Sequence, residues 1–399
     1  MRVLVITGWI HPDAEGGSFR VAYDIARGLA SRGHTVTVLT RRLSADHPAC
    51  QTIEGMDFRR YEVAGTSGFR LFWGTVRAVR KAAETLEADV LHLHHPFSAF
   101  GANMASALER IPRIMTFHMA RAEEYRDEAI YRASLRRARG APFPYPLGLG
   151  IRVWALRRID LFNLRHCSRI VVLSEFMRET LGNMDPSLVE RAVLIPGGVD
   201  TTRFNRGISR EVARRILGLP EGLVFFTLRR LEPRMGLENL VRAFAIVRRS
   251  RDAHLLIGGR GSLERLLTMM IEKEGLADRV KLLGFVEESR LPLYYRAADC
   301  TVIPTRALEG FGMAVIESLA CGTPVIGTPV GGMPEILRRV DPTLVAAGTS
   351  PDHLAETMLH IAERGAESFE ERAISVIREN YDLESIVSAY ERLLRDLYR

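Results

Sequence analysis

The sequence lacks any run of roughly 18 apolar residues, the length at which a transmembrane helix would be expected. Its first ten residues, MRVLVITGWI, place one basic residue directly before an alternating apolar run, which predicts a β-strand rather than a secretory signal. The four cysteines are scattered, and no two form a C-x-x-C pair. We therefore expect no membrane span, no zinc site and no disulfide framework, as in a protein of a reducing cytoplasm. The cysteines are Cys50, Cys167, Cys300 and Cys321.

The charge of the chain is unevenly distributed. Its 399 residues suffice for two domains, and 47% hydrophobic and 26% charged residues are ordinary for a globular protein. The net charge is +7, and residues 1–205 contain 28 basic and 21 acidic residues, against 27 of each in the remainder. The whole excess lies in the N-terminal half. It is either a solubilising imbalance or a sign of an anionic partner, such as a membrane surface or a phosphorylated molecule.

The N-terminal part reads as alternating strands and helices. The first strand candidate, RVLVIT, is followed by a glycine-rich loop, HPDAEGGS, and by a helical pattern over residues 19–34. A second strand candidate, TVTVLT, comes next. This order of strand, helix and strand predicts a parallel sheet with right-handed crossovers. Three later strand candidates each end in a polar residue, namely His94, His118 and Ser174. Because ligands bind beyond the carboxyl ends of such strands, we expect these three side chains to face one crevice.

A second strand–helix series follows IPGGVD (195–200), which is typical of a linker. Two α/β units make a cleft between them the expected ligand site. An arginine-rich helix–turn–helix is predicted over residues 119–168, with its break at Gly140 to Pro146. The strand candidates are 89–94, 113–118, 169–174, 223–228, 254–259, 280–285, 300–305 and 324–329, and further helices are predicted at 69–86, 237–250, 262–275 and 383–399.

The most specific segment is ALEGFGMAVIESLACGTPVIGT, residues 307–328. It enters a helix near Gly312, where free N–H groups and the helix dipole favour an anion such as a diphosphate. Gly310 and Gly312 let the backbone approach a ligand closely. Glu309 and Glu317 are eight residues apart, roughly 12 Å along a helix, which is far for the paired carboxylates of a glycosidase. Either glutamate alone would be interpreted as a solvated residue. With this spacing around Gly-Phe-Gly, the two are better interpreted as carboxylates that bind hydroxyl groups of a ligand.

These motifs resemble those of the GT-B-fold glycosyltransferases of family 4, the retaining glycogen-synthase-like class. The resemblance is strongest in E-G-F-G-M-A-V-I-E followed by S-L-A-C-G-T-P-V-I-G-T, and it covers nearly the whole chain in order. The other segments that carry it are EGG (15–17), TFH (116–118), LSEF (173–176), IPGGVDTTRF (195–204), RRLEPRMGLENLVRAF (229–244), GRGSLERLL and GFVEESRLPLYYRAADC.

The resemblance implies roles for individual residues. His118, Arg230, Arg234 and Glu309 would carry catalysis: His118 beside the transferred sugar, the arginines at the donor diphosphate, and Glu309 on sugar hydroxyls. Glu317 would hold the ribose, and the backbone around Val286 would meet the base. The remaining donor-binding positions would use their backbone on the diphosphate or sugar: Gly16, Gly17, Phe311, Gly312, Met313 and Ala314.

One position departs from the family pattern. R-L-x-x-x-K-G is usual, and this chain has Met235 where the lysine is expected. A methionine cannot neutralise a leaving diphosphate. We expect Arg234, one residue earlier, to substitute for that charge.

Several other patterns carry no site. His92 and His94 share a strand face while His95 points the other way, and no carboxylate or cysteine completes a metal site. The chain has no D-x-D, the metal-clamp signature of the other large glycosyltransferase fold, and GGRGSL does not complete G-x-G-x-x-G. The basic, aromatic stretch 69–86 is read as a half-buried helix, with a membrane-surface helix as the alternative.

Together these observations predict an α/β protein with the GT-B fold, in which two Rossmann-like domains face each other across a cleft. Residues 1–200, with a C-terminal helix of about 383–399, would bind the acceptor, and 205–380 the nucleotide sugar. The resemblance implies a metal-independent, retaining transfer from a UDP- or GDP-sugar to a hydroxyl by front-face attack, in polysaccharide or glycoconjugate biosynthesis. No cofactor and no nucleic-acid partner are expected, and the acceptor is left open, with anionic or lipid-linked molecules among the candidates.

Two alternatives remain open at this point. The first is a nucleotide-sugar 2-epimerase on the same fold, and the second is a non-catalytic subunit that binds a sugar nucleotide, which only Met235 suggests. The expected location is the cytoplasm, with contact to the inner face of the membrane through the basic N-terminal half as an option.

Overall fold

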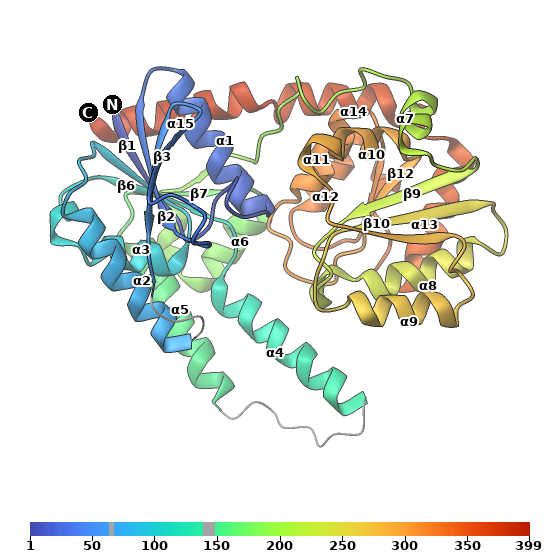
Figure 1. The fold of residues 1–399 in the computed structure, drawn as a ribbon, viewed down its shortest axis with the longest axis horizontal. Helices are drawn as coiled ribbons and strands as arrows, with labels where there is room; N and C mark the ends of the chain where they lie inside the picture. Colours follow the sequence, from blue (N-terminus) through green and yellow to red (C-terminus); the bar gives the residue numbers. More distant parts are fainter. Residues whose placement is uncertain (64–67, 139–147) are drawn as a thin grey trace. The chain divides into compact units, whose positions relative to one another are not determined.

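The computed structural model describes residues 1–63, 68–138 and 148–399. The described chain divides into two compact units (Figure 1). Unit 1 contains Met1–Arg126, residues 148–198 and Leu383–Arg399, and unit 2 contains residues 127–138 and Val199–Asp382. The change of unit after Gly198 falls within IPGGVD, and the last helix belongs to unit 1 although it follows unit 2 in sequence.

Unit 1 is built on an eight-stranded sheet in the order β3-β4-β2-β1-β5-β6-β7-β8. All neighbouring pairs are parallel except β3 and β4, which form an antiparallel hairpin at one edge. The central strands are mostly apolar, and all their residues except Arg2 are buried, as expected for a sheet covered on both faces. The strands are β1 (Arg2–Ile6), β2 (Thr35–Arg41), β3 (Cys50–Ile53), β4 (Met56–Tyr61), β5 (Val90–Leu93), β6 (Arg113–Phe117), β7 (Arg169–Val172) and β8 (Ala192–Leu194).

The helices of unit 1 cover this sheet in two groups. Helix α15 (Leu383–Tyr398) packs against α1 (Gly17–Ser31) and β5. Helix α3 (Pro96–Asn103) packs against both α2 (Gly68–Ala83) and α5 (Leu149–Arg165). The remaining helices that begin in this part of the chain are α4 (Arg121–Ala138) and α6 (Glu175–Met184).

Unit 2 contains a five-stranded, all-parallel sheet in the order β11-β10-β9-β12-β13. Helices α8 and α9 lie on one side of it, and α10 and α11 lie on the other (Figure 1). The strands are β9 (Leu223–Leu228), β10 (Ala253–Gly258), β11 (Val280–Gly284), β12 (Cys300–Ile303) and β13 (Val325–Gly327). The helices are α7 (Arg210–Leu217), α8 (Leu237–Val247), α9 (Glu264–Lys273), α10 (Leu291–Ala297), α11 (Met313–Ala320), α12 (Met333–Val340), α13 (Pro351–Arg364) and α14 (Glu367–Asn380).

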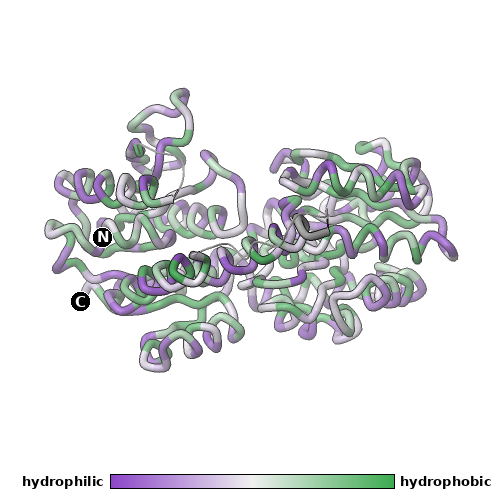
Figure 2. Tube along the Cα trace, turned by 90° about the horizontal axis from the view of Figure 1, so that it is seen from below, coloured by the Kyte–Doolittle hydropathy of each residue, from purple (hydrophilic) through white to green (hydrophobic). Residues whose placement is uncertain are grey.

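The hydropathy of the chain explains these layers. Hydrophobic and hydrophilic residues alternate along the helices of both units (Figure 2), as expected of helices that pack one face against a sheet. In unit 1 a hydrophobic core cluster joins β1, β5, β6 and β7 to the helices that flank them. Within the described residues, no helix combines the length and the apolar character needed to cross a membrane.

Each predicted strand exists, and most strands end one or two residues before the predicted limit. The parallel sheet predicted from the opening strand–helix–strand pattern is confirmed, because β1 and β2 pair in parallel. The hairpin at one edge, where β3 and β4 turn back on each other through Glu54 and Gly55, both at positive φ, was not predicted. The two helices predicted within 119–168 are α4 and α5. The break predicted from Gly140 to Pro146 lies outside the described residues.

Candidate active site

In unit 1, two of the three predicted polar strand ends meet. His118 follows β6, His94 follows β5, and Nδ1 of His94 lies 3.0 Å from Nε2 of His118. Burial lowers the pKa of His118 to about 4 and holds the pKa of His94 well below its usual value, so both rings are neutral at pH 7. The third predicted residue, Ser174, caps a helix instead: its hydroxyl accepts a hydrogen bond from the Met177 N–H at the start of α6.

The glycine loop of unit 1 leads into α1. Gly16 is the residue before the helix and Gly17 is its first residue, so this helix start has no side chain that could cap it. The loop is tied to the sheet by Asp13, whose carboxylate forms a bidentate, buried ion pair with Arg60 of β4, at 2.6 and 2.9 Å.

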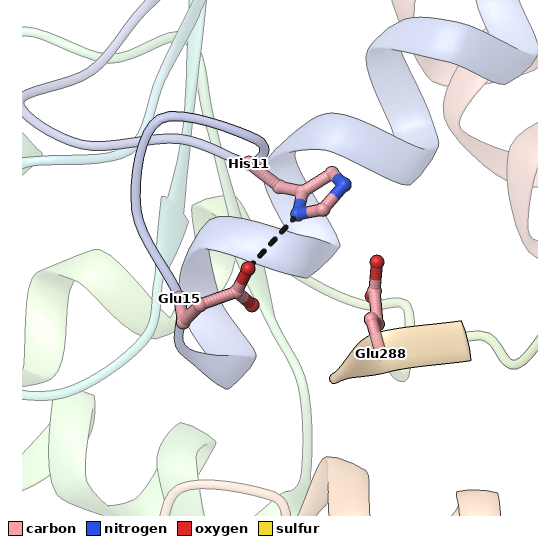
Figure 3. Close-up of side chains that lie close together, drawn as sticks. All are labelled: His11, Glu15 and Glu288. Carbon is pink, nitrogen blue, oxygen red and sulfur yellow. Dashed lines mark ion pairs between the residues drawn. The ribbon is translucent and has the colours of Figure 1, made fainter. Parts of the chain in front are cut away.

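Two loop residues of unit 1 and one residue of unit 2 are drawn in Figure 3. The dashed line joins His11 and Glu15, whose nitrogen and carboxylate oxygen lie 3.7 Å apart. Glu288 belongs to unit 2, where its carboxylate forms an ion pair of 3.1 Å with Arg203. Each carboxylate thus has a basic partner within its own unit.

In unit 2, the loop after β9 is fastened to the loop after β12. The Arg306 N–H donates to the Arg234 carbonyl at 2.8 Å, and Nη1 of Arg234 donates to the Leu308 carbonyl at 2.6 Å. Gly236, at φ 73°, fits here because a Cβ would lie 1.9 Å from the Pro304 carbonyl oxygen. The predicted substitute for the missing lysine therefore points toward the loop that carries Glu309.

Glu309 lies in a cationic setting. Arg229 forms an ion pair with its carboxylate, and the hydroxyl of Thr305 lies 3.4 Å from Oε2. Burial by itself raises the pKa of Glu309, but the charges of Arg229 and Arg234 and the hydrogen bonds from Arg229 and Thr305 outweigh it and lower the pKa overall. Glu309 is therefore an ionised hydrogen-bond acceptor at neutral pH.

The backbone next to Glu309 is tightly packed. Leu308 adopts φ 59°, a left-handed conformation that costs a non-glycine residue about 1–2 kcal/mol. The Gly332 N–H donates to the Glu309 carbonyl at 3.0 Å, and a Cβ on Gly331 would lie 1.8 Å from that carbonyl oxygen. A second loop, after β13, therefore limits where Glu309 can sit.

The other residues of the Glu309 motif form the start of α11. Gly312, at φ 105°, precedes the helix and has no side chain to cap it, so the N–H groups of Met313 and Ala314 are directed to whatever lies beyond this end. Phe311 is buried against Tyr381, with ring centroids 5.8 Å apart. Phe311 anchors the loop, while the backbone supplies the donors.

The last predicted donor-binding residues also have defined partners. Glu317 accepts a hydrogen bond of 2.8 Å from the hydroxyl of Tyr295. Val286 lies after β11 beside Gly258, where a Cβ would come within 2.9 Å of its side chain. Strand ends β10 and β11 thus approach each other closely at the place predicted for the base.

Arg230 and Met235 face different surroundings. The side chain of Arg230 is exposed, and within the described part of the chain its guanidinium has no hydrogen-bond or ion-pair partner. Met235 is buried, with 5% of its surface exposed. One arginine of the loop is therefore available to an anionic ligand, while the methionine belongs to the core.

Sequence reasoning missed Arg229, Thr305 and Tyr295, which contact the two predicted glutamates. The family pattern starts at Arg230, so the arginine before it drew no attention. One usable signal was its place directly after Leu228, the last residue of β9, where side chains reach the ligand edge of a parallel sheet. Chemically, the assembled groups offer arginine donors, an ionised acceptor and a helix N-terminus, a set suited to an anionic ligand with hydroxyl groups.

Family models match both halves of the chain. Residues 15–203 match the model described as Glycosyltransferase Family 4, and residues 209–378 match Glycosyl transferases group 1. The D-inositol 3-phosphate glycosyltransferase of Nocardiopsis dassonvillei is 31% identical over 379 residues, which cover 87% of this chain and 82% of that protein.

Solved structures share the fold over the full length. Sucrose-phosphate synthase from Thermosynechococcus elongatus has a TM-score of 0.83 at 21% identity, covering 100% of this chain and 99% of that one. Anabaena HepE in complex with UDP-glucose has a TM-score of 0.73 at 18% identity, covering 99% of this chain and 100% of that one. Fold and site thus define a sugar-transferring enzyme with the two-domain GT-B fold. The chain belongs to the family 4, group 1 glycosyltransferases.

Proposed function

We propose that this enzyme transfers a sugar from a UDP- or GDP-sugar to an acceptor hydroxyl, with retention of anomeric configuration and without a metal ion. The observation that carries the proposal is the ionised Glu309 beside Arg229 and Arg234, next to the uncapped start of α11. An acceptor-only carboxylate suits sugar hydroxyls, and the cations and helix start suit a diphosphate. HepE, a structural neighbour, binds UDP-glucose, which supports a uridine nucleotide as the first donor to test.

The proposed chemistry needs no covalent enzyme intermediate. The acceptor oxygen forms a bond to the anomeric carbon, and the bond from that carbon to the diphosphate oxygen breaks with its electron pair on the diphosphate. A phosphate oxygen of the donor takes the acceptor proton. Arg230, Arg234 and the N–H groups at the start of α11 neutralise the charge that develops on the leaving group. Glu309 positions the sugar through its hydroxyl groups.

The acceptor is proposed to be anionic. The whole excess positive charge of the sequence lies in residues 1–205, and the Nocardiopsis relative acts on an inositol phosphate. Positive charge raises the local concentration of an anionic acceptor and speeds its binding. A phosphorylated polyol and a lipid-linked sugar share this chemistry, and free and lipid-bound acceptors can be compared directly.

Helix α2 supports the proposal of contact with an anionic membrane surface. It contains Arg70, Arg77, Arg80 and Lys81 and no acidic residue. Phe69 and Trp73 on the same helix are 77% and 40% exposed, with ring centroids 5.9 Å apart. Such a helix can insert its aromatic rings among lipid headgroups while its cations bind the phosphates.

The catalytic proposal is tested with the purified full chain. A thermal-shift screen of UDP-, GDP- and ADP-sugars identifies the donor, because a ligand that binds only the folded protein raises its melting temperature. NMR of the products then distinguishes transfer with retention, epimerisation of the donor, and binding without turnover. Glu309→Ala and Arg230→Ala should each abolish transfer in folded protein, and activity should survive EDTA. Near-normal turnover of either variant, or an epimer as the product, would contradict the proposal.

The membrane proposal needs a separate experiment. Full-length protein should sediment with phosphatidylglycerol vesicles and not with phosphatidylcholine vesicles, and added salt should release it. Replacing Phe69 and Trp73 by serine should weaken binding. The matched control is Ile216→Ser, which removes an apolar side chain of α7 that is 56% exposed. Equal binding of both variants would count against α2 as the contact.

A further inference from the structure

Arg229 occupies a buried position between two loops of unit 2. Only 9% of its side chain is exposed, and Nη2 donates a hydrogen bond of 2.7 Å to the Thr305 hydroxyl. The same nitrogen pairs with Oε2 of Glu309. Since Arg229 directly follows β9, its backbone is held by the sheet, and its N–H donates to the Gly258 carbonyl at 3.0 Å. The guanidinium of Arg229 therefore contacts Glu309 from a backbone position that the sheet fixes.

The two oxygens of the Glu309 carboxylate differ. Oε2 is bound by Arg229 and lies 3.4 Å from the Thr305 hydroxyl. Oε1 forms no hydrogen bond with any residue in the described ranges. A carboxylate held through one oxygen keeps its other oxygen in a set direction, as an acceptor for a ligand hydroxyl must be.

The charge state of Glu309 depends on its surroundings. Burial raises the pKa of this carboxyl group, and Arg229 is the largest influence that lowers it, followed by Arg234 and Thr305. The nearby Tyr295 of α10 and Glu317 of α11 form their own hydrogen bond, at 2.8 Å. Without Arg229 the burial of Glu309 would be opposed chiefly by Arg234. The pKa of the carboxyl group would then rise.

We infer that Arg229 is a positioning residue, which keeps Glu309 ionised and aims its free oxygen at a hydroxyl of the bound sugar. The inference rests on the proposed role of Glu309. It also accounts for Met235, because Arg229 places a second cation beside Arg234 at the loop in which a lysine is missing. Arg229, at the end of β9, thus supplies the positive charge that the family lysine would have contributed.

The test compares Arg229→Met, Arg229→Gln and Arg229→Lys in the full-length chain. Carboxyl carbons of glutamate are labelled with ¹³C, and the Glu309 signal is assigned by its loss in Glu309→Gln. We expect the pKa of Glu309 to rise in Arg229→Met and to stay low in Arg229→Lys, which keeps the charge. With UDP-glucose as the donor, or the sugar nucleotide that stabilises the protein most, kcat should fall roughly 100-fold in Arg229→Met and recover partly in Arg229→Lys. In the plot of kcat against pH for Arg229→Met, the acidic limb should shift to higher pH.

The matched control is Arg251→Met, which removes a surface arginine that pairs with Glu363 at 2.9 Å in the same unit. It should change neither the Glu309 pKa nor kcat. If Arg229→Met does not fold, Arg229→Gln is measured instead. An unchanged Glu309 pKa in the neutral variant, or a lysine variant no better than the neutral one, overturns the inference. Wild-type protein that neither binds nor turns over any sugar nucleotide contradicts the proposed function instead, since the NMR titration does not depend on turnover.

Discussion

The hydroxyl of Tyr295 donates a hydrogen bond of 2.8 Å to Oε2 of Glu317 and thereby joins α10 to α11. Tyr295 is fully buried, and burial, followed by the charge of Glu317 and the hydrogen bond to it, raises the pKa of its hydroxyl well above the ordinary value. The hydroxyl thus remains a proton donor at any working pH. Tyr295 therefore orients the carboxylate that is proposed to bind the ribose.

Removing this hydroxyl should weaken donor binding. In Tyr295→Phe we expect KM for the donor to rise about tenfold, since a hydrogen bond to a charged group is worth roughly 1.5–3 kcal/mol, while kcat changes little. The control is Tyr294→Phe on the same helix, whose ring stacks on Phe226 at 5.5 Å and whose hydroxyl has no partner among the described residues. Steady-state kinetics of both variants decide the matter, and equal KM values would speak against a donor role of Glu317.

Arg230 should matter for turnover and not for stability. Its side chain is exposed and unpaired within the described ranges, so Arg230→Ala should change the free energy of unfolding by less than about 0.5 kcal/mol. Loss of a cation that stabilises the leaving diphosphate should lower kcat by roughly 100-fold or more. Arg249→Ala, at another exposed arginine of unit 2, is the comparison. If both substitutions lower kcat by a similarly small factor, Arg230 does not belong to the active site.

Restoring the family lysine should not help. Met235 is 5% exposed, and Met235→Lys would bury an ammonium group at a cost of several kcal/mol. We expect a lower melting temperature and no gain in kcat, because Arg229 and Arg234 already approach Glu309. Thermal unfolding and initial rates test this. A variant faster than wild type would show that the charge of this loop is incomplete.

Crowding at Gly331 should control the position of Glu309. Both Gly331 and Gly218 have positive φ, 68° and 62°, but a Cβ meets the Glu309 carbonyl oxygen at 1.8 Å in the first case and nothing within 4 Å in the second. Gly218→Ala should therefore cost only the backbone penalty of about 1 kcal/mol. Gly331→Ala should in addition shift Glu309 and lower kcat by roughly 100-fold. Equal kcat values in the two folded variants would show that the loop containing Gly331 does not affect catalysis.

The buried histidines should make unit 1 sensitive to acid. Burial, assisted by the charge of His118, lowers the pKa of His92 to about 3, and burial lowers that of His118 to about 4. Since an unfolded histidine titrates near 6.5, the unfolded chain binds more protons at intermediate pH. Stability is thus complete above about pH 6.5 and falls as the pH drops toward 4, by about 2 kcal/mol per histidine at pH 5.

Thermal unfolding between pH 7 and pH 5 measures this dependence. His92→Asn should make this dependence less steep, whereas His360→Asn, at an exposed position of α13, should leave it unchanged. The Nε2 atom of His92 lies 2.8 Å from the Thr116 hydroxyl, which in turn lies 3.2 Å from the Tyr390 hydroxyl of α15. Loss of the C-terminal helix from the sheet should accompany the transition. The same slope in all three proteins would refute the assignment.

Several features of this enzyme follow from the sequence alone. Buried parallel strands are short apolar runs between helical patterns, so periodicity located most of the elements, and a polar residue at a strand end, such as His118, marks the ligand edge. The Glu309 motif could be found because its chemistry lies within one continuous segment. The hairpin of β3 and β4 escaped notice, since an exposed edge strand such as CQTI has little apolar pattern.

Tertiary structure decided which side chains meet. Arg229 and Glu309 are eighty residues apart, and only the neighbouring positions of β9 and β12 in the sheet bring their loops together. The return of α15 to unit 1 likewise depends on packing against α1 and β5. Local patterns determine elements because they depend on near neighbours along the chain. Burial and charge at a site depend on partners far apart in sequence, which no spacing rule specifies.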